Sequence, residues 1–364
     1  MAAAAGVYIH IPYCKQRCGY CSFVSSCDPS TQEAYAARVK AELAGIKSER
    51  IAADTLYIGG GTPSVLRRGL LSDLIAAVRA AFLLDADAEI TAECNPESCT
   101  DDFLSEAKNA GVNRLSMGLQ DADDTVLRGA GRLHSRADFV GAVGRARAAG
   151  LENLSVDLML GLPGQTVTHV EASVKLLLSL DIPHISVYAL KLEPDSALAK
   201  SYTPDEDLEA DFYQCAAGLL TAAGRARYEV SNFARPGRES RHNLKYWTHT
   251  PYYGFGVAAH SFYHEMRYAN PDSLTEYLSG ASRRTETPLS PEELREETVM
   301  LRLRLAAGLE LDAYEQKFGE NLREKKAAEI RSLCALGMIE IKNGRLFATD
   351  RGMYLLNSLI LRLI

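Results

Sequence analysis

The chain has 364 residues, of which 47% are hydrophobic and 24% are charged, and its formal net charge is -7 at pH 7. This composition is normal for a globular protein of one large domain or two ordinary ones. The negative charge excludes a general attraction to nucleic acid or to anionic membranes, so either contact would require a local basic patch.

The N-terminus, MAAAAGVYIHIP, lacks the charged segment and the longer apolar core of a secretion signal. No run approaches the roughly eighteen apolar residues of a membrane span. Eight cysteines, three of them clustered, fit a reducing compartment and one metal site better than a disulfide framework. We therefore expect a cytoplasmic protein without stable membrane insertion.

Short β-rich runs alternate with longer amphipathic runs up to about residue 190. The predicted strands are 7–11, 55–58, 88–93, 114–117, 154–159 and 184–190. The predicted helices between them include 30–46, 66–82, 135–149 and 165–180. This alternation predicts an α/β fold with parallel strands. Six units are fewer than the eight of a closed barrel, so we expect an open or partial barrel of the TIM type.

Polar or glycine-rich groups follow the carboxyl end of nearly every predicted strand. In chain order these groups are Cys14, Cys18 and Cys21, then Gly59, Gly60, Gly61 and Thr62, then Glu93 and Asn95, then Gln120, then Asp157. In a parallel barrel the carboxyl ends of the strands converge on one mouth, where active sites are built. The separate motifs are therefore predicted to form one site.

The pattern changes after the predicted barrel. Residues 1–205 are predicted to form the core, and 206–289 an extension rich in Tyr and His, whose pattern is irregular from about 206 to 262. Residues 290–364 read as helices, a hairpin with an Asn343-Gly344 turn and a further helix, an order that resembles a winged helix. This last region has 12 basic and 12 acidic residues. A neutral balance argues against nucleic-acid binding.

The spacing C-x3-C-x2-C puts Cys14, Cys18 and Cys21 on one short loop. Three thiolates can bind three irons of a cubic 4Fe-4S cluster and leave the fourth iron open for a ligand. Zinc is the main rival, but a structural zinc site needs a fourth ligand, which Cys27 or His10 would have to supply at unusual spacing.

This loop resembles the signature of radical S-adenosylmethionine proteins, and GGGTPS at 59–64 is similar to their glycine motif. Within that superfamily the chain resembles the group that contains the coproporphyrinogen III oxidase HemN and the HemW haem chaperones, through ECNPES, GVNRLSMGLQ, GRLHS and VDLMLGLPGQT. The resemblance implies a 4Fe-4S cluster and S-adenosylmethionine. It implies that one cofactor molecule contacts Tyr8, Gly60, Glu93 and Ala189. It also implies that this molecule or a second copy is surrounded by Tyr20, Gly61, Thr62, Gln120, Arg132 and Asp157.

Two features distinguish the branches of this group. The oxidase-type loop resembles C-x3-C-x2-C-x-C, whereas this chain has Phe23 at the last position. The segment HNLKYW resembles the H-N-x-x-Y-W signature of the chaperone branch, and its haem candidates are His242, Asn243, Tyr246 and Trp247. An imidazole suits axial ligation of haem iron, and aromatic rings can pack on the macrocycle. Three further histidines are rivals for the iron: His249, His260 and His264.

Three functions follow as hypotheses. The leading one is a haem chaperone that transfers haem to acceptor proteins, and we expect it to be a monomer. The second is a radical S-adenosylmethionine enzyme that acts on a porphyrinogen. The third, a nucleic-acid-binding regulator, is disfavoured by the balanced charge of the C-terminal region.

Overall fold

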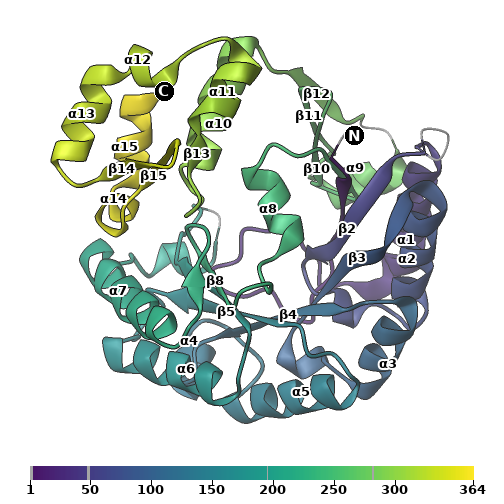
Figure 1. Ribbon diagram of the computed structural model, residues 1–364. Coiled ribbons are helices and arrows are strands. Elements are labelled where there is room, and N and C mark those ends of the chain that lie inside the picture. Colours follow the sequence, from purple (N-terminus) through teal and green to yellow (C-terminus); the bar gives the residue numbers. More distant parts are fainter. Residues whose placement is uncertain (1–2, 47–49, 195, 281–282) are drawn as a thin grey trace.

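The computed structural model describes residues 3–46, 50–194, 196–280 and 283–364, and its framework is a curved sheet with helices around its outer face (Figure 1). Its parallel strands are β1 (Ala5–Ile11), β2 (Ala52–Gly60), β3 (Leu83–Cys94), β4 (Arg114–Gln120), β5 (Leu154–Leu160) and β6 (His184–Ala189). The helices between them are α1 (Gln32–Ala44), α2 (Leu70–Ala81), α3 (Asp101–Ala110), α4 (Asp124–Gly129), α5 (Arg136–Ala148) and α6 (Val167–Ser179). The predicted α/β architecture is confirmed, although α3 and α4 had no counterpart among the helices named from the sequence.

The sheet continues beyond both ends of the six-strand core. Outward from β1 the strands follow in the order β9 (Tyr252–Phe255), β10 (His260–Tyr263), β11 (Met266–Ala269) and β12 (Thr285–Pro288). Beside β6 lie β8 (Asn232–Ala234) and β7 (Ala226–Arg227). Strand β9 is parallel to β1, whereas β8 is antiparallel to β6. In the described part of the chain β12 does not pair with β7, so the barrel is partial, as predicted from the number of units.

The sequence pattern over 206–262 is irregular, yet the segment forms regular helices and strands. Helix α7 (Glu206–Ala222) spans 17 residues and begins at Asp205, whose side chain accepts hydrogen bonds from the backbone of Asp207 and Leu208. Its buried residues are Phe212, Ala216 and Leu220. They recur every four residues, which is the spacing of one helix face. Scattered polar residues make this periodicity hard to recognise in the sequence. The remainder of the segment forms short strands and helix α8 (Arg241–Trp247).

The C-terminal region has a core of its own and is mostly helical. Its elements are α10 (Pro291–Arg302), β13 (Leu309–Glu310), α11 (Leu311–Phe318), α12 (Leu322–Lys325), α13 (Ala327–Ala335), β14 (Ile339–Lys342), β15 (Arg345–Ala348), α14 (Asp350–Tyr354) and α15 (Leu356–Leu363). A short helix, α9 (Leu274–Ser279), precedes it. Asn343 and Gly344 both have positive φ between β14 and β15, as the predicted hairpin turn requires. None of the helices in the described ranges combines the length and the apolar composition that a membrane crossing needs.

Strand alternation separates an apolar outer face from a polar interior. On β4 the outward residues Leu115, Met117 and Leu119 belong to the hydrophobic core under the helices. The alternate residues Arg114 and Ser116 line the interior cavity. Because successive strand residues point to opposite faces, each strand supplies both layers. The barrel interior is therefore polar, unlike the branched apolar filling of closed TIM barrels.

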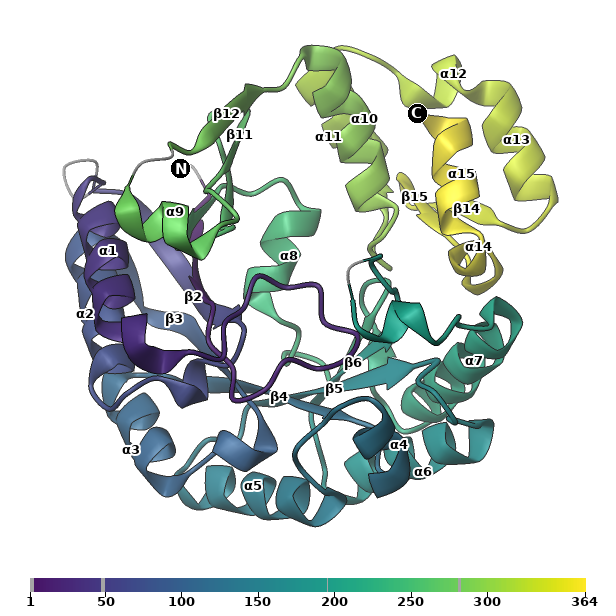
Figure 2. The ribbon, with the colours of Figure 1, turned by 180° about the vertical axis from the view of Figure 1, so that it is seen from behind.

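Two segments occupy opposite openings of the partial barrel. Figure 1 shows α8 in the middle of the ring on the near side, and Figure 2, from behind, shows the loop after β1 on its own near side. Glu89 accepts hydrogen bonds from the backbone of Arg241 and His242, which fixes the start of α8 beside the middle of β3. The cysteine loop lies instead at the carboxyl ends of the strands. Helix α8 is thus the floor of the barrel and the cysteine loop lies at its mouth.

The pairing of β9 with its neighbours depends on a glycine. A Cβ on Gly254 would clash with the carbonyl oxygen of His260, a backbone atom that cannot move aside cheaply. We predict that Gly254→Ala lowers the free energy of unfolding by about 2 kcal/mol or more. Gly144→Ala is the matched control, because its Cβ within α5 meets nothing within 4 Å. The control should stabilise the protein by about 0.5–1 kcal/mol. Urea unfolding of both variants checks this, and equal effects would contradict it.

Candidate functional site

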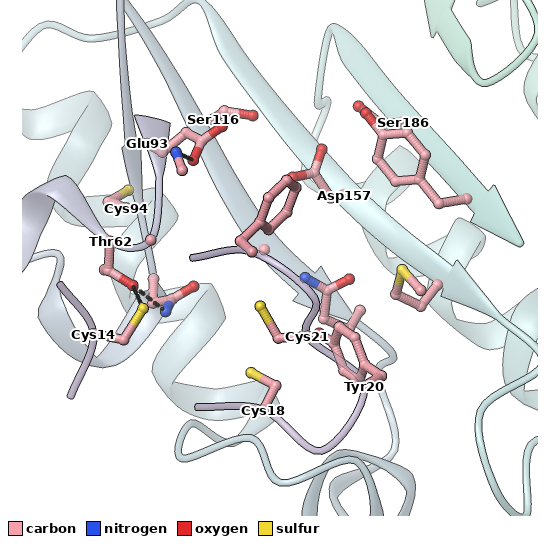
Figure 3. A pocket seen from close by; sticks show the side chains of 18 of the residues that line it. Cys14, Cys18, Tyr20, Cys21, Thr62, Glu93, Cys94, Ser116, Asp157 and Ser186 are labelled. Atoms are coloured by element: carbon pink, nitrogen blue, oxygen red, sulfur yellow. Dashed lines mark hydrogen bonds between the residues drawn. The ribbon is translucent and has the colours of Figure 1, made fainter. Parts of the chain in front are cut away.

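A cavity of about 360 Å³ begins beside the cysteine loop and continues into the barrel interior (Figure 3). Of the residues predicted for the site, those that line it are Cys14, Cys18, Tyr20, Cys21, Gly60, Gly61, Thr62, Glu93, Asn95, Gln120, Arg132, Asp157, Ala189 and Asn243. Predicted residues absent from this lining are Tyr8, Gly59, His242, Tyr246 and Trp247. The structure therefore brings the residues expected near the cluster and the cofactor into one cavity, with Tyr8 and Gly59 as the exceptions.

The cysteine loop is closed at its base by backbone hydrogen bonds. The amide of Cys14 donates to Ser26 at 3.0 Å, and the amide of Ser26 donates to Pro12 at 2.6 Å. Figure 3 shows the sulfurs of Cys14, Cys18 and Cys21 at one end of the cavity. The loop therefore presents three thiols from a short segment whose ends are fixed.

Two side chains donate hydrogen bonds to these sulfurs. The Thr62 hydroxyl lies 3.4 Å from Cys14 Sγ, and Arg132 Nη1 lies 3.3 Å from Cys18 Sγ. Burial raises the pKa of Cys14 to about 11 and also raises the pKa of Cys21. A thiol in this setting keeps its proton unless a metal replaces it. Donors aimed at sulfur are the environment that iron-sulfur ligands need, so the residues present fit a cluster.

The fourth ligands considered for zinc lie elsewhere. Both ring nitrogens of His10 are hydrogen bonded, one to the Tyr8 hydroxyl and the other to the carbonyl oxygen of Val24. Cys27 is exposed and lines a separate cavity on the other side of Cys14. Neither His10 nor Cys27 lines the cavity that the three cysteines share, which argues against a four-ligand zinc site here.

The glycine motif holds the loop against the sheet. The amide of Gly61 donates to Ile11 at 2.8 Å, and the amide of Thr62 donates to Tyr13 at 2.7 Å. A Cβ on Gly61 would lie 2.7 Å from the Ile11 oxygen, and one on Gly60, where φ is +107°, would clash with the His10 ring. The glycines are thus required by the packing of the protein itself, in addition to any approach of a cofactor.

Glu93 is fixed at the centre of the site. The Tyr57 hydroxyl donates to its Oε1 at 2.7 Å and the amide of Gly60 donates to its Oε2 at 3.0 Å. Burial and, to a smaller extent, the nearby carboxyl of Asp157 raise the pKa of Glu93 to about 7, against the lowering effect of these hydrogen bonds. The side chain is therefore held in one position, where it can accept a hydrogen bond from a ligand.

Several polar atoms in the cavity wall have no partner within the described chain. Among them are Gln120 Oε1 and Arg132 Nε. Gln120 also has a positive φ of 71°, a conformation that is strained for a residue with a side chain. Buried polar atoms without partners are costly unless something else satisfies them. This wall fits a polar ligand such as S-adenosylmethionine, whose amino, carboxyl and ribose groups can supply these bonds.

His242 is buried on α8 and both of its ring nitrogens are engaged. Nδ1 lies 2.9 Å from the Thr55 hydroxyl and Nε2 lies 2.8 Å from the Tyr246 hydroxyl. Burial lowers the pKa of His242 to about 3, with Lys245 and Arg114 contributing in the same direction. The imidazole is therefore neutral, as iron ligation requires, but its lone pair is already directed at a neighbour.

The other predicted haem residues also belong to α8, and the rival histidines follow it in the chain. Asn243 lines the floor of the cavity, and the Tyr246 ring packs edge-on against Tyr252 at 4.7 Å. Trp247 is half-buried at the last turn of α8. The rival His249 stacks on Phe262. His260 and His264, the remaining rivals, are exposed.

Sequence reasoning missed part of the cavity wall. The unpredicted lining residues include Tyr57, Arg114, Ser116, Ser155, Ser186 and Tyr188. All of them lie within strands rather than after them, and Figure 3 shows Ser116 and Ser186 well away from the cysteines. Strand alternation was the signal that could have found them, because 114, 116 and 120 share one face of β4.

Phe23 is exposed at the mouth. Its exposed fraction is 60%, and it lines the cavity together with Arg17 and Lys191. An aromatic ring and two cations therefore stand where a ligand would enter.

Comparison with known proteins agrees with this geometry. Residues 8–177 match the model of the radical SAM superfamily, and residues 289–355 match that of the HemN C-terminal domain. The solved structure of the HemN coproporphyrinogen III oxidase from Escherichia coli superimposes with a TM-score of 0.86 at 23% identity, covering 100% of this chain and 90% of the other. At that identity the likeness shows the fold alone.

Curated relatives match nearly the whole chain. The protein named heme chaperone HemW from Bacillus subtilis is 34% identical over 366 residues, covering 96% of this chain and 97% of its own length. The Mycobacterium tuberculosis (strain H37Rv) protein of that name is 35% identical over 377 residues, covering 99% of this chain and 94% of its own. The chain belongs to the HemW family of radical SAM proteins.

Proposed function

We propose that this chain is a haem chaperone that binds a 4Fe-4S cluster, S-adenosylmethionine and haem, and passes haem to acceptor proteins. The observation that carries the proposal is the position of α8, whose HNLKYW sequence reaches the floor of the cavity lined by the cysteines through Asn243. The names of the full-length relatives support the same function.

The cluster belongs on Cys14, Cys18 and Cys21, with hydrogen bonds from Thr62 and Arg132 to the sulfurs. S-adenosylmethionine belongs in the adjoining cavity, where the acceptors are Glu93, Asp157 and Gln120 and the donors include Tyr20 and Arg132. When bound, cluster and cofactor together supply one-electron chemistry. The chain's own residues orient the ligands and limit access of water to the cavity.

Haem ligation by His242 requires a local rearrangement. Either the Thr55 or the Tyr246 hydrogen bond must break before a ring nitrogen can reach iron. Each such bond contributes about 1 kcal/mol, so a modest gain from the iron bond suffices to shift the population. Haem binding at His242 is therefore accompanied by movement of the imidazole or of α8.

We also propose that the chain is a cytoplasmic monomer without a nucleic-acid partner or stable membrane insertion. All eight cysteines are free thiols, which suits a reducing compartment. The identity of the haem acceptor is left to experiment.

The second candidate is a radical S-adenosylmethionine enzyme that acts on a porphyrinogen. The observation that favours it is the cavity itself, because the wall near the cluster retains unsatisfied polar atoms for a cofactor. Phe23, which stands at the position of the oxidase-type cysteine, favours the chaperone instead.

Loss of a cluster ligand tests the metal site. We predict that Cys14→Ala, Cys18→Ala and Cys21→Ala each abolish cluster binding, because two thiolates cannot hold the cubic cluster. Iron and sulfide analysis after anaerobic reconstitution measures this. Cys27→Ala is the matched control and should retain the cluster, since Cys27 is exposed outside the cavity. Loss of the cluster from the control as well would contradict the assignment.

Haem titration tests the chaperone function. We predict saturable binding of one haem per chain to the anaerobic cluster-loaded protein, weakened at least tenfold by His242→Ala. Tyr246→Phe should tighten binding about fivefold, because the hydrogen bond to Nε2 no longer has to break. Soret absorbance measures both, and exposed His260→Ala is the control. Absence of stoichiometric haem binding would overturn the proposal. Loss of haem binding in His260→Ala but not in His242→Ala would assign the iron ligand to His260 instead.

Turnover separates the two candidates. Anaerobic incubation of the reduced, cluster-loaded protein with coproporphyrinogen III and S-adenosylmethionine should yield no protoporphyrinogen. Chromatography of the oxidised porphyrins measures the product. Formation of protoporphyrinogen would favour the enzyme over the chaperone.

A further inference from the structure

Arg114 is a buried cation at the floor of the cavity. It is the first residue of β4, is 1% exposed, and lines the cavity below Ser116. Its Nε has no hydrogen-bond partner within the described chain. The two carboxylates of β3 near Arg114 accept their hydrogen bonds from other groups, Glu93 from Tyr57 and Gly60, and Glu89 from the amides of Arg241 and His242.

Two other arginines of the barrel donate hydrogen bonds to groups of the chain itself. Arg225 donates to the carbonyl oxygens of Ile182 and Ala223, and it also contacts Asp181. The terminal nitrogens of Arg132 donate to Cys18, Asn95 and Gly118, although its Nε, like that of Arg114, has no partner in the described chain. An unpaired buried guanidinium is costly, because the lost hydration is not replaced. Arg114 is therefore the side chain whose surroundings call for an anion.

The neighbours on the cavity floor indicate which anion fits. Asn243 lines the same cavity from α8, and Ser116 and Ser155 add hydroxyl groups. A guanidinium fork beside an amide matches the two oxygens of a carboxylate. Glu93 and Asp157 line the same cavity, and their negative charge disfavours a dianion such as phosphate.

We infer that Arg114, together with Asn243, forms a carboxylate-binding subsite on the floor of the cavity. The inference deepens the proposed function, on which its choice of ligands rests. The carboxylate belongs either to a propionate of the tetrapyrrole or to the amino-acid end of an S-adenosylmethionine molecule. Because Asn243 is on α8 next to His242, a carboxylate bound here contacts the helix that carries the predicted haem ligand.

Ligands that differ only in the carboxylate test the subsite. Dissociation constants are measured for haem and haem dimethyl ester, and for S-adenosylmethionine and its decarboxylated form, on the cluster-loaded wild type and Arg114→Gln. For each ligand pair, the ratio of the dissociation constant without the carboxylate to that with it measures how much the carboxylate contributes. In one of the two pairs this ratio should be at least tenfold larger for the wild type than for Arg114→Gln. The pair that shows this difference identifies the source. Contacts of the carboxylate to other groups are common to both proteins and cancel in the comparison.

Two further variants keep the test decisive. Arg225→Gln, which removes a satisfied buried arginine, should leave both ligand ratios as in the wild type. If Arg114→Gln does not fold, the same measurements are made on Arg114→Lys and Asn243→Ala. Each of these variants should show a smaller ratio of dissociation constants than the wild type. Equal ratios for wild type and the folded floor variants in both pairs would overturn the subsite. Failure of haem to bind at all would overturn the chaperone instead, and the cofactor pair would still report on Arg114.

Discussion

The whole site depends on the close approach of two backbone segments, residues 11–13 and 60–62. Their hydrogen bonds place the cysteine loop over the ends of β1 and β2, and they form only because Gly60 and Gly61 lack side chains. Thr62 follows directly and donates to Cys14, so the same approach positions a donor for the first sulfur. A substitution in this glycine motif therefore moves the three cysteines of the loop without changing any of them.

The polar barrel interior sets a second constraint, because every buried charge in it needs a partner. Buried polar groups need partners as well, and one hydrogen-bonded chain runs from Ser155 to His184 and then to Tyr228, which accepts from the amide of Ser240 at the start of α8. This chain joins a cavity-lining residue to the floor helix. A ligand that contacts the wall near Ser155 is therefore linked to α8 by a continuous series of hydrogen bonds.

The sequence predicted most of the fold and the mouth of the site, because parallel strands, glycine turns and the cysteine spacing leave local signals. Prediction failed where the signal was not local. Arg114 looks like an ordinary strand residue until the sheet curves and buries its charge. His242 looked like an available ligand, but its bonds to Thr55 and Tyr246 depend on the packing of α8 against β2. Helix α7 was missed because its four-residue apolar spacing is diluted by polar residues.

Helix α8 lies between the cofactor cavity and the C-terminal domain, and both sides hold it. On one side Glu89 binds its first amides. On the other, Arg302 of α10 donates to Thr248, at the end of the helix, and Glu297 pairs with His249. A displacement of α8 that frees His242 must either break these contacts or move the contacting residues together with the helix. Because the C-terminal domain is attached at this point, release of His242 from its hydrogen bonds and movement of that domain share one energetic cost.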